Sequence, residues 1–321
     1  MCASMAQATA QIVTLRHSIL DDILTDFGLS SRFARKMLEP LLWLAAHRFA
    51  HLAARFDRAV LKLGFQEALR RVLPILVHDV YYRGTEHIPT EGPLLVVSNH
   101  PGSYDSLAIA AGLPRSDLQI VAAGFRTLRS LPHASQHLIF VNPQSRANLS
   151  AVRSVICHLR SGGAVLVFPG GCLEPDPVLL PGASEALHAW SPSMQLFLDS
   201  VPRARTMITV ASGFIAPRFL RSPLARLGNG RYDPLAIAEI AQGIAQLLLP
   251  NLVRLKPSVS YGIARSVDEL RQQGETLHQS IVAEAGRRMA DHVRGCGPEQ
   301  SPSGRWWSGQ LTTGGLAQGL G

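Results

Sequence analysis

Short apolar runs alternate with helical stretches along most of the chain after residue 73. The apolar runs, rich in β-branched residues, predict strands at 75–82, 94–98, 118–122, 138–141, 164–168, 206–212 and 257–263. Helical periodicity and start signals predict helices at 103–111, 147–161, 191–200, 234–249 and 266–293. This alternation is typical of an α/β fold, and we expect a mostly parallel central sheet flanked by helices.

Residues 30–71 have a different pattern, that of a basic N-terminal amphipathic helical segment. Basic residues repeat on one face, among them Arg48, Arg55 and Lys62. Apolar residues recur at helical spacing on another face, at Phe49, Leu52, Phe56, Val60 and Leu63. Such a helix can lie in a membrane interface, or its apolar stripe can pack on the protein core while its arginines are solvated. The pattern leaves both interpretations open.

These patterns divide the chain into three parts. Residues 1–73 are predicted to form the helical, membrane-interfacial or core-packed segment, and residues 74–294 the α/β domain. Residues 295–321 are rich in Gly and Ser, with little apolar patterning, so we expect a disordered tail.

The composition indicates a folded protein with an anionic partner. The chain has 321 residues, is 46% hydrophobic and carries a formal net charge of +8. The basic 30–71 segment and a second cluster between Val201 and Arg231 supply much of this charge. No nucleic-acid-binding module accompanies it, and the basic residues are interleaved with bulky aliphatics, so an anionic membrane surface is the expected partner and nucleic acid is not.

The cysteines and the apolar segments bear on the location of the protein. The four cysteines, Cys2, Cys157, Cys172 and Cys296, are scattered, which argues against a disulfide framework and a structural zinc site and favours a reducing compartment. No secretion signal and no run of about 20 apolar residues is found. We therefore expect a cytoplasmic protein that is peripheral on the cytoplasmic face of the membrane, with no metal.

The most informative stretch joins the predicted strand 94–98 to the helix 103–111. It contains Asn99 and His100, a Pro-Gly turn, and Asp105 in the first helical turn. The Asp105 carboxylate can bind one ring nitrogen of His100 and leave the other nitrogen to accept a proton, as a general base with an orienting group does. The His-x4-Asp spacing alone is weak evidence, because His17 and Asp22 have the same spacing within a helical stretch.

A second loop follows the predicted strand 164–168 and reads FPGGCLEPDP from Phe168 to Pro177. Its Pro-Gly-Gly turn allows the backbone to approach a ligand and to point N–H groups at a phosphate or an oxyanion. A plain Pro-Gly exit from a strand would look the same. Two loops at the carboxyl ends of strands in one α/β domain favour a ligand site, because ligands bind there in such sheets.

Together these two motifs resemble the lysophospholipid and glycerol-phosphate acyltransferase family, that of the 1-acylglycerol-3-phosphate acyltransferases. The family has a strand-borne N-H-x4-D, here Asn99, His100 and Asp105, and a downstream F-P-x-G loop, here Phe168 to Gly171. The resemblance covers roughly residues 82–263. It implies His100 and Asp105 as the catalytic residues, and as substrate-binding residues Asn99, Gly102, Ser103, Arg146, Phe168, Pro169, Gly170 and Gly171.

The chain departs from the family pattern at three places. Gly170 stands where many members have the Glu of F-P-E-G-T-R, Cys172 and Leu173 replace the Thr-Arg pair, and Pro143 takes the place of a second-block arginine that Arg146 could substitute. These changes put a phosphate on the acceptor in doubt. Other branches of the superfamily resemble F-P-G-G here.

The resemblance implies transfer of a fatty acyl group from a thioester, acyl-CoA or acyl carrier protein, to a hydroxyl of a lysophospholipid or related lipid-like acceptor. No cofactor is expected, because the thioester is already activated and only a base and an oxyanion donor are needed. Two alternatives remain: a non-catalytic, membrane-associated lipid-binding protein of the same fold, and a hydrolase that uses Cys172. The sequence has no G-x-S-x-G elbow for a serine hydrolase.

Overall fold

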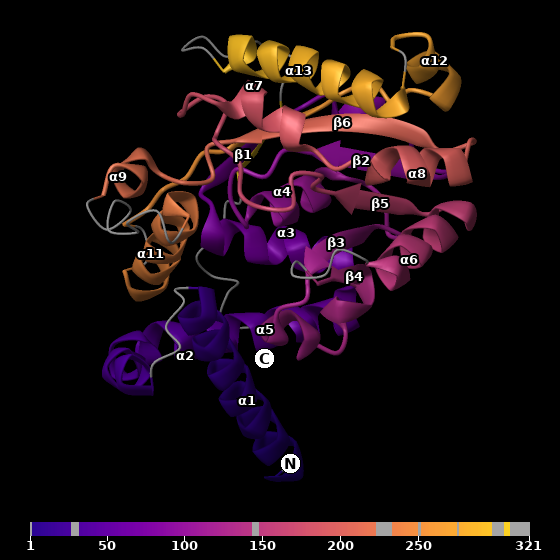
Figure 1. Ribbon diagram of the computed structural model, residues 1–321. Helices are drawn as coiled ribbons and strands as arrows, with labels where there is room; N and C mark the ends of the chain where they lie inside the picture. Colours follow the sequence, from indigo (N-terminus) through magenta and orange to yellow (C-terminus); the bar gives the residue numbers. More distant parts are fainter. Residues whose placement is uncertain are drawn as a thin grey trace.

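The computed structural model describes residues 2–26, 32–142, 148–222, 233–249, 252–274 and 276–296, and the backbone of 305–308. Over these residues the strands form one sheet in the order β4-β3-β5-β2-β6-β7-β1-β8, which crosses the middle of the molecule (Figure 1). The strands are β1 Asp79–Arg83, β2 Leu94–Ser98, β3 Gln119–Ala123, β4 Leu138–Val141, β5 Ala164–Val167, β6 Arg205–Ser212, β7 Ser258–Tyr261 and β8 Arg305–Ser308.

Most neighbouring strands run parallel, as the sequence predicted. The pairs β2–β5, β2–β6, β3–β4, β3–β5 and β1–β7 are parallel, whereas β6–β7 and β1–β8 are antiparallel. The carboxyl ends of β2, β5 and β6 therefore lie at the same edge of the sheet. The two loops that the sequence marked for chemistry, after β2 and after β5, begin at this edge.

Helices cover both faces of the sheet (Figure 1). The α-helices of the described residues are α1 Cys2–Asp26, α2 Arg32–Leu63, α3 Phe65–Leu76, α4 Asp105–Gly112, α5 Arg126–Arg129, α6 Leu149–Arg160, α7 Ala183–Ala186, α8 Ser193–Ser200, α9 Pro217–Leu220, α11 Pro234–Leu248, α12 Val267–Arg271 and α13 Leu277–Gly295. Short 3-10 helices lie at Thr85–His87, Ala134–His137 and Leu187–Ala189. The predicted α/β fold with a flanked, mostly parallel sheet is confirmed.

Strand β2 shows how the sheet separates two hydrophobic cores. Leu94 and Val96 point into a core shared with α1 to α4, and Leu95 and Val97 into a second core with α6, α8 and α13. All four are fully buried. A strand buried on both faces carries a continuous apolar run rather than an alternating pattern, which is why β2 reads as unbroken aliphatic residues.

Two predicted helices are each broken in the structure. The predicted 30–71 helix is interrupted at Gly64, whose φ of 81° lies in the left-handed region that favours glycine, so α2 ends and α3 begins there. The predicted 266–293 helix is two helices, because the Thr276 side chain accepts a hydrogen bond from the Gln279 N–H and caps a new helix, α13. The helical spacing of apolar residues continues across both breaks, so this pattern alone predicted one helix in each case.

The apolar stripe of α2 packs on the protein. Phe49, Leu52 and Phe56 are partly buried against the core on the α1 to α4 side of the sheet, and Val60 is buried within it. Leu63, the last residue of the predicted stripe, is 40% exposed. The core-packed interpretation of this stripe therefore holds for most of its length. α3 also continues past residue 73 to Leu76, beyond the predicted end of the helical segment.

The predicted disordered tail contains one element. Residues 305–308 form β8, whose backbone pairs antiparallel with β1 at the edge of the sheet. The tail residues 297–304 and 309–321 lie outside the described residues, so the prediction for them stays a prediction. None of the described helices has the length and apolar character needed to cross a membrane.

Candidate active site

His100 and Asp105 meet at the carboxyl end of β2. The His100 Nδ1 lies 2.9 Å from Asp105 Oδ2 and 3.0 Å from Oδ1. Asp105 is fully buried at the start of α4, whereas the His100 side chain is 22% exposed. Because Nδ1 is held by the carboxylate, Nε2 is the ring nitrogen left to take up a proton.

The surroundings of His100 are acidic. Burial lowers the pKa of His100, but the charge and the hydrogen bond of Asp105 raise it, and the charges of Glu239 and Glu174 add to this effect. The net result is a pKa above the ordinary value of 6.5. His100 is thus a stronger base than a free imidazole, and the imidazolium it forms on taking a proton is stabilised by carboxylates.

The second His-x4-Asp copy forms no dyad. His17 and Asp22 both lie within α1, and His17 is exposed. The Asp22 carboxylate instead accepts hydrogen bonds from the Thr127 N–H and hydroxyl, at 3.0 and 2.7 Å, and from the Arg126 N–H. It holds the start of α5 against α1, which is a structural role.

The FPGG loop lies against the dyad, as the sequence predicted for two loops at one sheet edge. The Phe168 and His100 rings have centroids 4.4 Å apart. The Gly171 N–H donates to the Phe168 carbonyl within the loop, at 3.1 Å, with Gly171 at a φ of 70°. Gly171 therefore closes the turn. The Gly170 N–H has no hydrogen-bond partner among the described residues.

Residues just beyond the FPGG motif fix this loop in place. The Glu174 N–H donates to the His100 carbonyl oxygen at 2.8 Å, and the Asp176 carboxylate accepts from the N–H groups of Val178 and of Gly213 after β6. Both acidic residues are buried. The loops after β2, β5 and β6 are thereby joined into one rim around His100.

Asn99 and Ser103, two of the other predicted substrate-binding residues near the dyad, make hydrogen bonds within the protein. Both ends of the Asn99 amide bond Ala211 of β6, at 3.0 and 2.9 Å, so Asn99 fixes the end of β2 that carries His100. The Ser103 N–H and hydroxyl donate to the Glu239 carboxylate, the hydroxyl at 2.8 Å. A Cβ at Gly102 would lie 3.0 Å from the Phe214 Cβ, which indicates a tight fit there.

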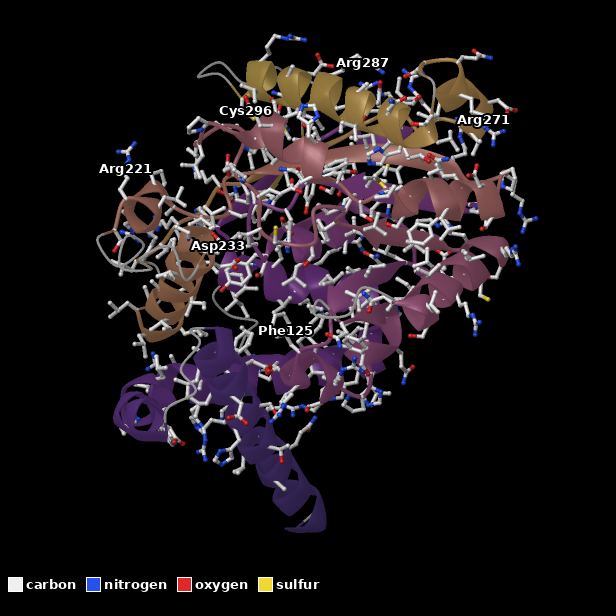
Figure 2. The ribbon with its side chains drawn as sticks, in the orientation of Figure 1. Phe125, Arg221, Asp233, Arg271, Arg287 and Cys296 are labelled. Atoms are coloured by element: carbon white, nitrogen blue, oxygen red, sulfur yellow. The ribbon has the colours of Figure 1, made fainter. Side chains whose placement is uncertain are left out.

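Two acidic residues of the site, Glu239 and Glu174, were not predicted from the sequence. Glu239 lies on α11, 136 residues after its partner Ser103, and α11 lies beside the carboxyl edge of the sheet (Figure 1). Figure 2 places Asp233, the N-cap residue of α11, in the same region. Glu174 stood within the quoted loop, but only the fold shows that its side chain turns inward.

Two further site predictions have different outcomes. Arg146, with Pro143, lies outside the described residues. Cys172 is exposed on the surface, and partial burial of its thiol together with the charges of Glu174 and Asp233 raises its pKa. A raised pKa lowers the thiolate fraction and disfavours Cys172 as a nucleophile. Over the described residues, no group of three or more His, Cys, Asp or Glu is placed to hold a metal ion.

Comparisons with known proteins agree with the geometry. Residues 79–194 match the model of a family described as Acyltransferase, and this range contains the dyad and the FPGG loop. The matching part of the chain thus bears out the acyltransferase resemblance and its implied acyl-transfer activity. No curated protein matches the chain.

One similar solved structure is the crystal structure of the 1-acyl-sn-glycerophosphate (LPA) acyltransferase, PlsC, from Thermotoga maritima. It has 15% sequence identity and a TM-score of 0.44, and the match covers 79% of this chain and 93% of that one.

Proposed function

We propose that the chain transfers a fatty acyl group from a thioester donor, acyl-CoA or acyl carrier protein, to a hydroxyl of a lipid-like glycerolipid acceptor. The match of residues 79–194 to the Acyltransferase family model supports this proposal. The observation that carries this proposal is the His100–Asp105 pair at the carboxyl end of β2, with Nδ1 2.9 Å from the carboxylate. An activated thioester needs a base for the acceptor alcohol and no enzyme nucleophile, and this arrangement supplies that base.

In the proposed reaction, His100 Nε2 takes the proton of the acceptor hydroxyl as its oxygen attacks the thioester carbonyl carbon. The resulting tetrahedral oxyanion collapses, the C–S bond breaks, and the leaving thiolate takes the proton from the imidazolium. The Asp105 carboxylate stabilises that imidazolium and keeps Nδ1 protonated. The Gly170 N–H is the loop donor that we assign to the oxyanion, since the Gly171 N–H is engaged within the turn.

We propose a lipid-like acceptor rather than free glycerol 3-phosphate. A small phosphate ester needs fixed cationic groups, and the charged side chains that act on His100 are the carboxylates Asp105, Glu239 and Glu174. A lysolipid also brings an acyl chain, whose burial contributes about 0.8 kcal/mol per CH₂ without a phosphate clamp. The acidic site is the observation that favours this choice.

Membrane docking would present such an acceptor, and α2 with the end of α11 offers a surface for it. We call this the α2–α11 surface: Leu44 and Leu249, 44% and 56% exposed, with Arg48, which lies one helical turn after Leu44 on α2. The Arg48 guanidinium donates to the Leu247 and Leu248 carbonyls at 2.8 and 2.9 Å, which brings the two helices together. Exposed aliphatic and basic side chains together suit an anionic interface.

The second basic cluster of the sequence does not form a single docking face. Arg203 and Arg205 lie at the amino end of β6, where they bond backbone carbonyls of Arg160 and Ala264. Arg218 and Arg221 lie in and just after α9, beyond the carboxyl end of β6. In Figure 2, Arg221 projects on the side opposite Arg271. Arg226 and Arg231 lie outside the described residues. Of the cluster residues that the structure describes, the α9 pair lies at the site edge of the sheet and Arg203 and Arg205 lie at the other end of β6.

A transfer assay tests the proposed function. Purified protein with labelled acyl thioester should acylate a lysolipid in acidic vesicles much better than free glycerol 3-phosphate, and Cys172→Ser should retain this activity. His100→Ala supplies the inactive control. No transfer to any hydroxyl acceptor would favour the non-catalytic lipid-binding alternative, and loss of activity in Cys172→Ser alone would favour the hydrolase.

Sedimentation with vesicles tests the membrane part separately. We expect binding to anionic vesicles that weakens as salt rises, since each Lys or Arg near the surface contributes about 1 kcal/mol. Leu44→Ala, on the α2–α11 surface, should weaken binding, whereas Leu196→Ala, at a 50% exposed leucine of α8, should not. Equal binding to neutral and anionic vesicles would contradict the electrostatic part.

A further inference from the structure

Glu174 is a buried acidic residue that the proposed reaction does not use. It is 4% exposed, and its N–H donates to the His100 carbonyl oxygen at 2.8 Å. Its Oε1 accepts from the Trp190 indole N–H, also at 2.8 Å. Its Oε2 is buried and has no hydrogen-bond partner among the described residues. An acid held in this way next to the base needs an explanation, because burying a carboxyl with one oxygen unsatisfied costs free energy.

Gly170 makes room for this carboxyl. A Cβ at position 170 would lie 2.0 Å from Glu174 Oε1 and 3.0 Å from its Cδ, well inside contact distance. Gly170 does not have the positive φ that would require glycine, whereas its neighbour Gly171 does, and nothing lies within 4 Å of a Cβ at Gly171. The two glycines thus have different roles: Gly171 permits the turn, and Gly170 leaves the space that Glu174 fills.

We propose that Glu174 is a positioning residue of the active site, whose carboxyl fills the space left by Gly170 and so holds the loop 168–174 against His100. Two interactions of Glu174 then hold the loop. Its N–H donates to the His100 carbonyl, and its carboxyl lies between Gly170 and the Trp190 indole. Where it concerns turnover, this inference rests on the proposed function. Where it concerns the loop and the state of His100, it stands on the contacts alone.

The charge of Glu174 also bears on the dyad. Burial raises the pKa of Glu174 to about 7, while the Trp190 hydrogen bond and the His100 charge oppose this and the Asp105 charge adds to it. Its ionised form in turn raises the pKa of His100, together with Asp105 and Glu239. The charge of Glu174 also raises the pKa of the Cys172 thiol. His100 and Glu174 therefore titrate as an interacting pair.

The first test is a double-mutant cycle on the glycine and the carboxyl. Gly170→Ala should lower the thermal midpoint by roughly 2–4 °C and reduce transfer, because the new methyl group displaces Glu174. In a Glu174→Ala background the same Gly170→Ala change should have little further effect on either quantity. An equal loss from Gly170→Ala in both backgrounds would overturn the steric part of the proposal.

The second test separates positioning from charge. Glu174→Gln keeps an oxygen for the Trp190 indole and removes the negative charge, so the pKa of His100, followed by NMR with His100→Ala for assignment, should fall. The acid limb of the pH–rate profile should move to lower pH with it, because His100 acts as a base when neutral. Glu185→Gln, at an exposed glutamate of α7, is the matched control.

The outcomes of these tests are independent of one another. An unchanged His100 titration in Glu174→Gln would overturn the electrostatic part. If the wild-type protein transfers no acyl group, the proposed function fails, yet the thermal midpoints and the NMR titration still decide whether Glu174 holds the loop and acts on His100.

Discussion

The two His-x4-Asp copies of this chain have the same spacing and different surroundings. His100 ends a strand and Asp105 begins a helix, so the turn between them brings the side chains to 2.9 Å. His17 and Asp22 lie on one helix, where residues five apart point about 140° away from each other. At this spacing, the turn between strand and helix brings the two side chains together, whereas a continuous helix keeps them apart.

The largest contrast is expected between the two histidines. His100→Ala should lower acyl transfer about 10²–10⁴-fold, since it removes the general base, whereas His17→Ala should leave the rate near that of the wild type. Both proteins are compared at saturating thioester, with circular dichroism to verify folding. A fully active His100→Ala protein would contradict the proposed mechanism and the distinction between the two His-x4-Asp copies.

Substitution of the two aspartates should affect different properties, the transfer rate for Asp105 and the stability for Asp22. Asp105→Asn keeps the shape of a fully buried side chain but loses the carboxylate that orients His100, so we expect a rate loss of about 10²-fold or more with little change in thermal midpoint. Asp22→Ala should instead cost about 1–2 kcal/mol of stability, because it deprives the Thr127 N–H and hydroxyl of their acceptor, with the rate retained.

Chemical denaturation and kinetics on the same preparations measure both effects. The structural role of Asp22 would be contradicted if Asp22→Ala impaired transfer in a protein that remains folded. The catalytic role of Asp105 would be contradicted if Asp105→Asn were as active as the wild type.

A smaller effect is expected from pH. Neutral His100 is the active base, and its pKa is raised above 6.5 by the Asp105, Glu239 and Glu174 carboxylates against the lowering effect of burial. The rate should therefore fall about tenfold per pH unit below an apparent pKa that exceeds 6.5. Initial rates across a buffer series measure this limb, and His17→Ala should leave it in place. A limb centred well below 6.5 would show that the carboxylates do not act on His100 as described.

The sequence predicted the parts of this site that depend on local order. The strands at Leu94–Ser98 and Leu138–Val141 have the predicted bounds, because a short apolar run followed by a turn signal defines such an element locally. The dyad followed from the strand–turn–helix order around His100. Periodicity gave no warning of the break at Gly64, because the apolar pattern continues across it.

The sequence could not place the residues whose role depends on tertiary contacts. Glu239 reaches Ser103 across 136 residues, and no local pattern marks that pairing. The family resemblance implied Asn99 as a substrate-binding residue, and it could not reveal that the Asn99 amide bonds Ala211 on the neighbouring strand. Glu174 was visible in the loop, but the inward turn of its side chain depends on the space at Gly170.

The shared space of Gly170 and Glu174 has a consequence for the evolution of this loop. A side chain at position 170 and an inward carboxyl from position 174 exclude each other, since they would stand 2.0 Å apart. The two positions should therefore change together among descendants of this chain, by way of intermediates in which one is small before the other grows. A lineage that gains an acidic side chain at 170 should first have lost the one at 174, so the order of these substitutions along a reconstructed tree is constrained by a single steric contact.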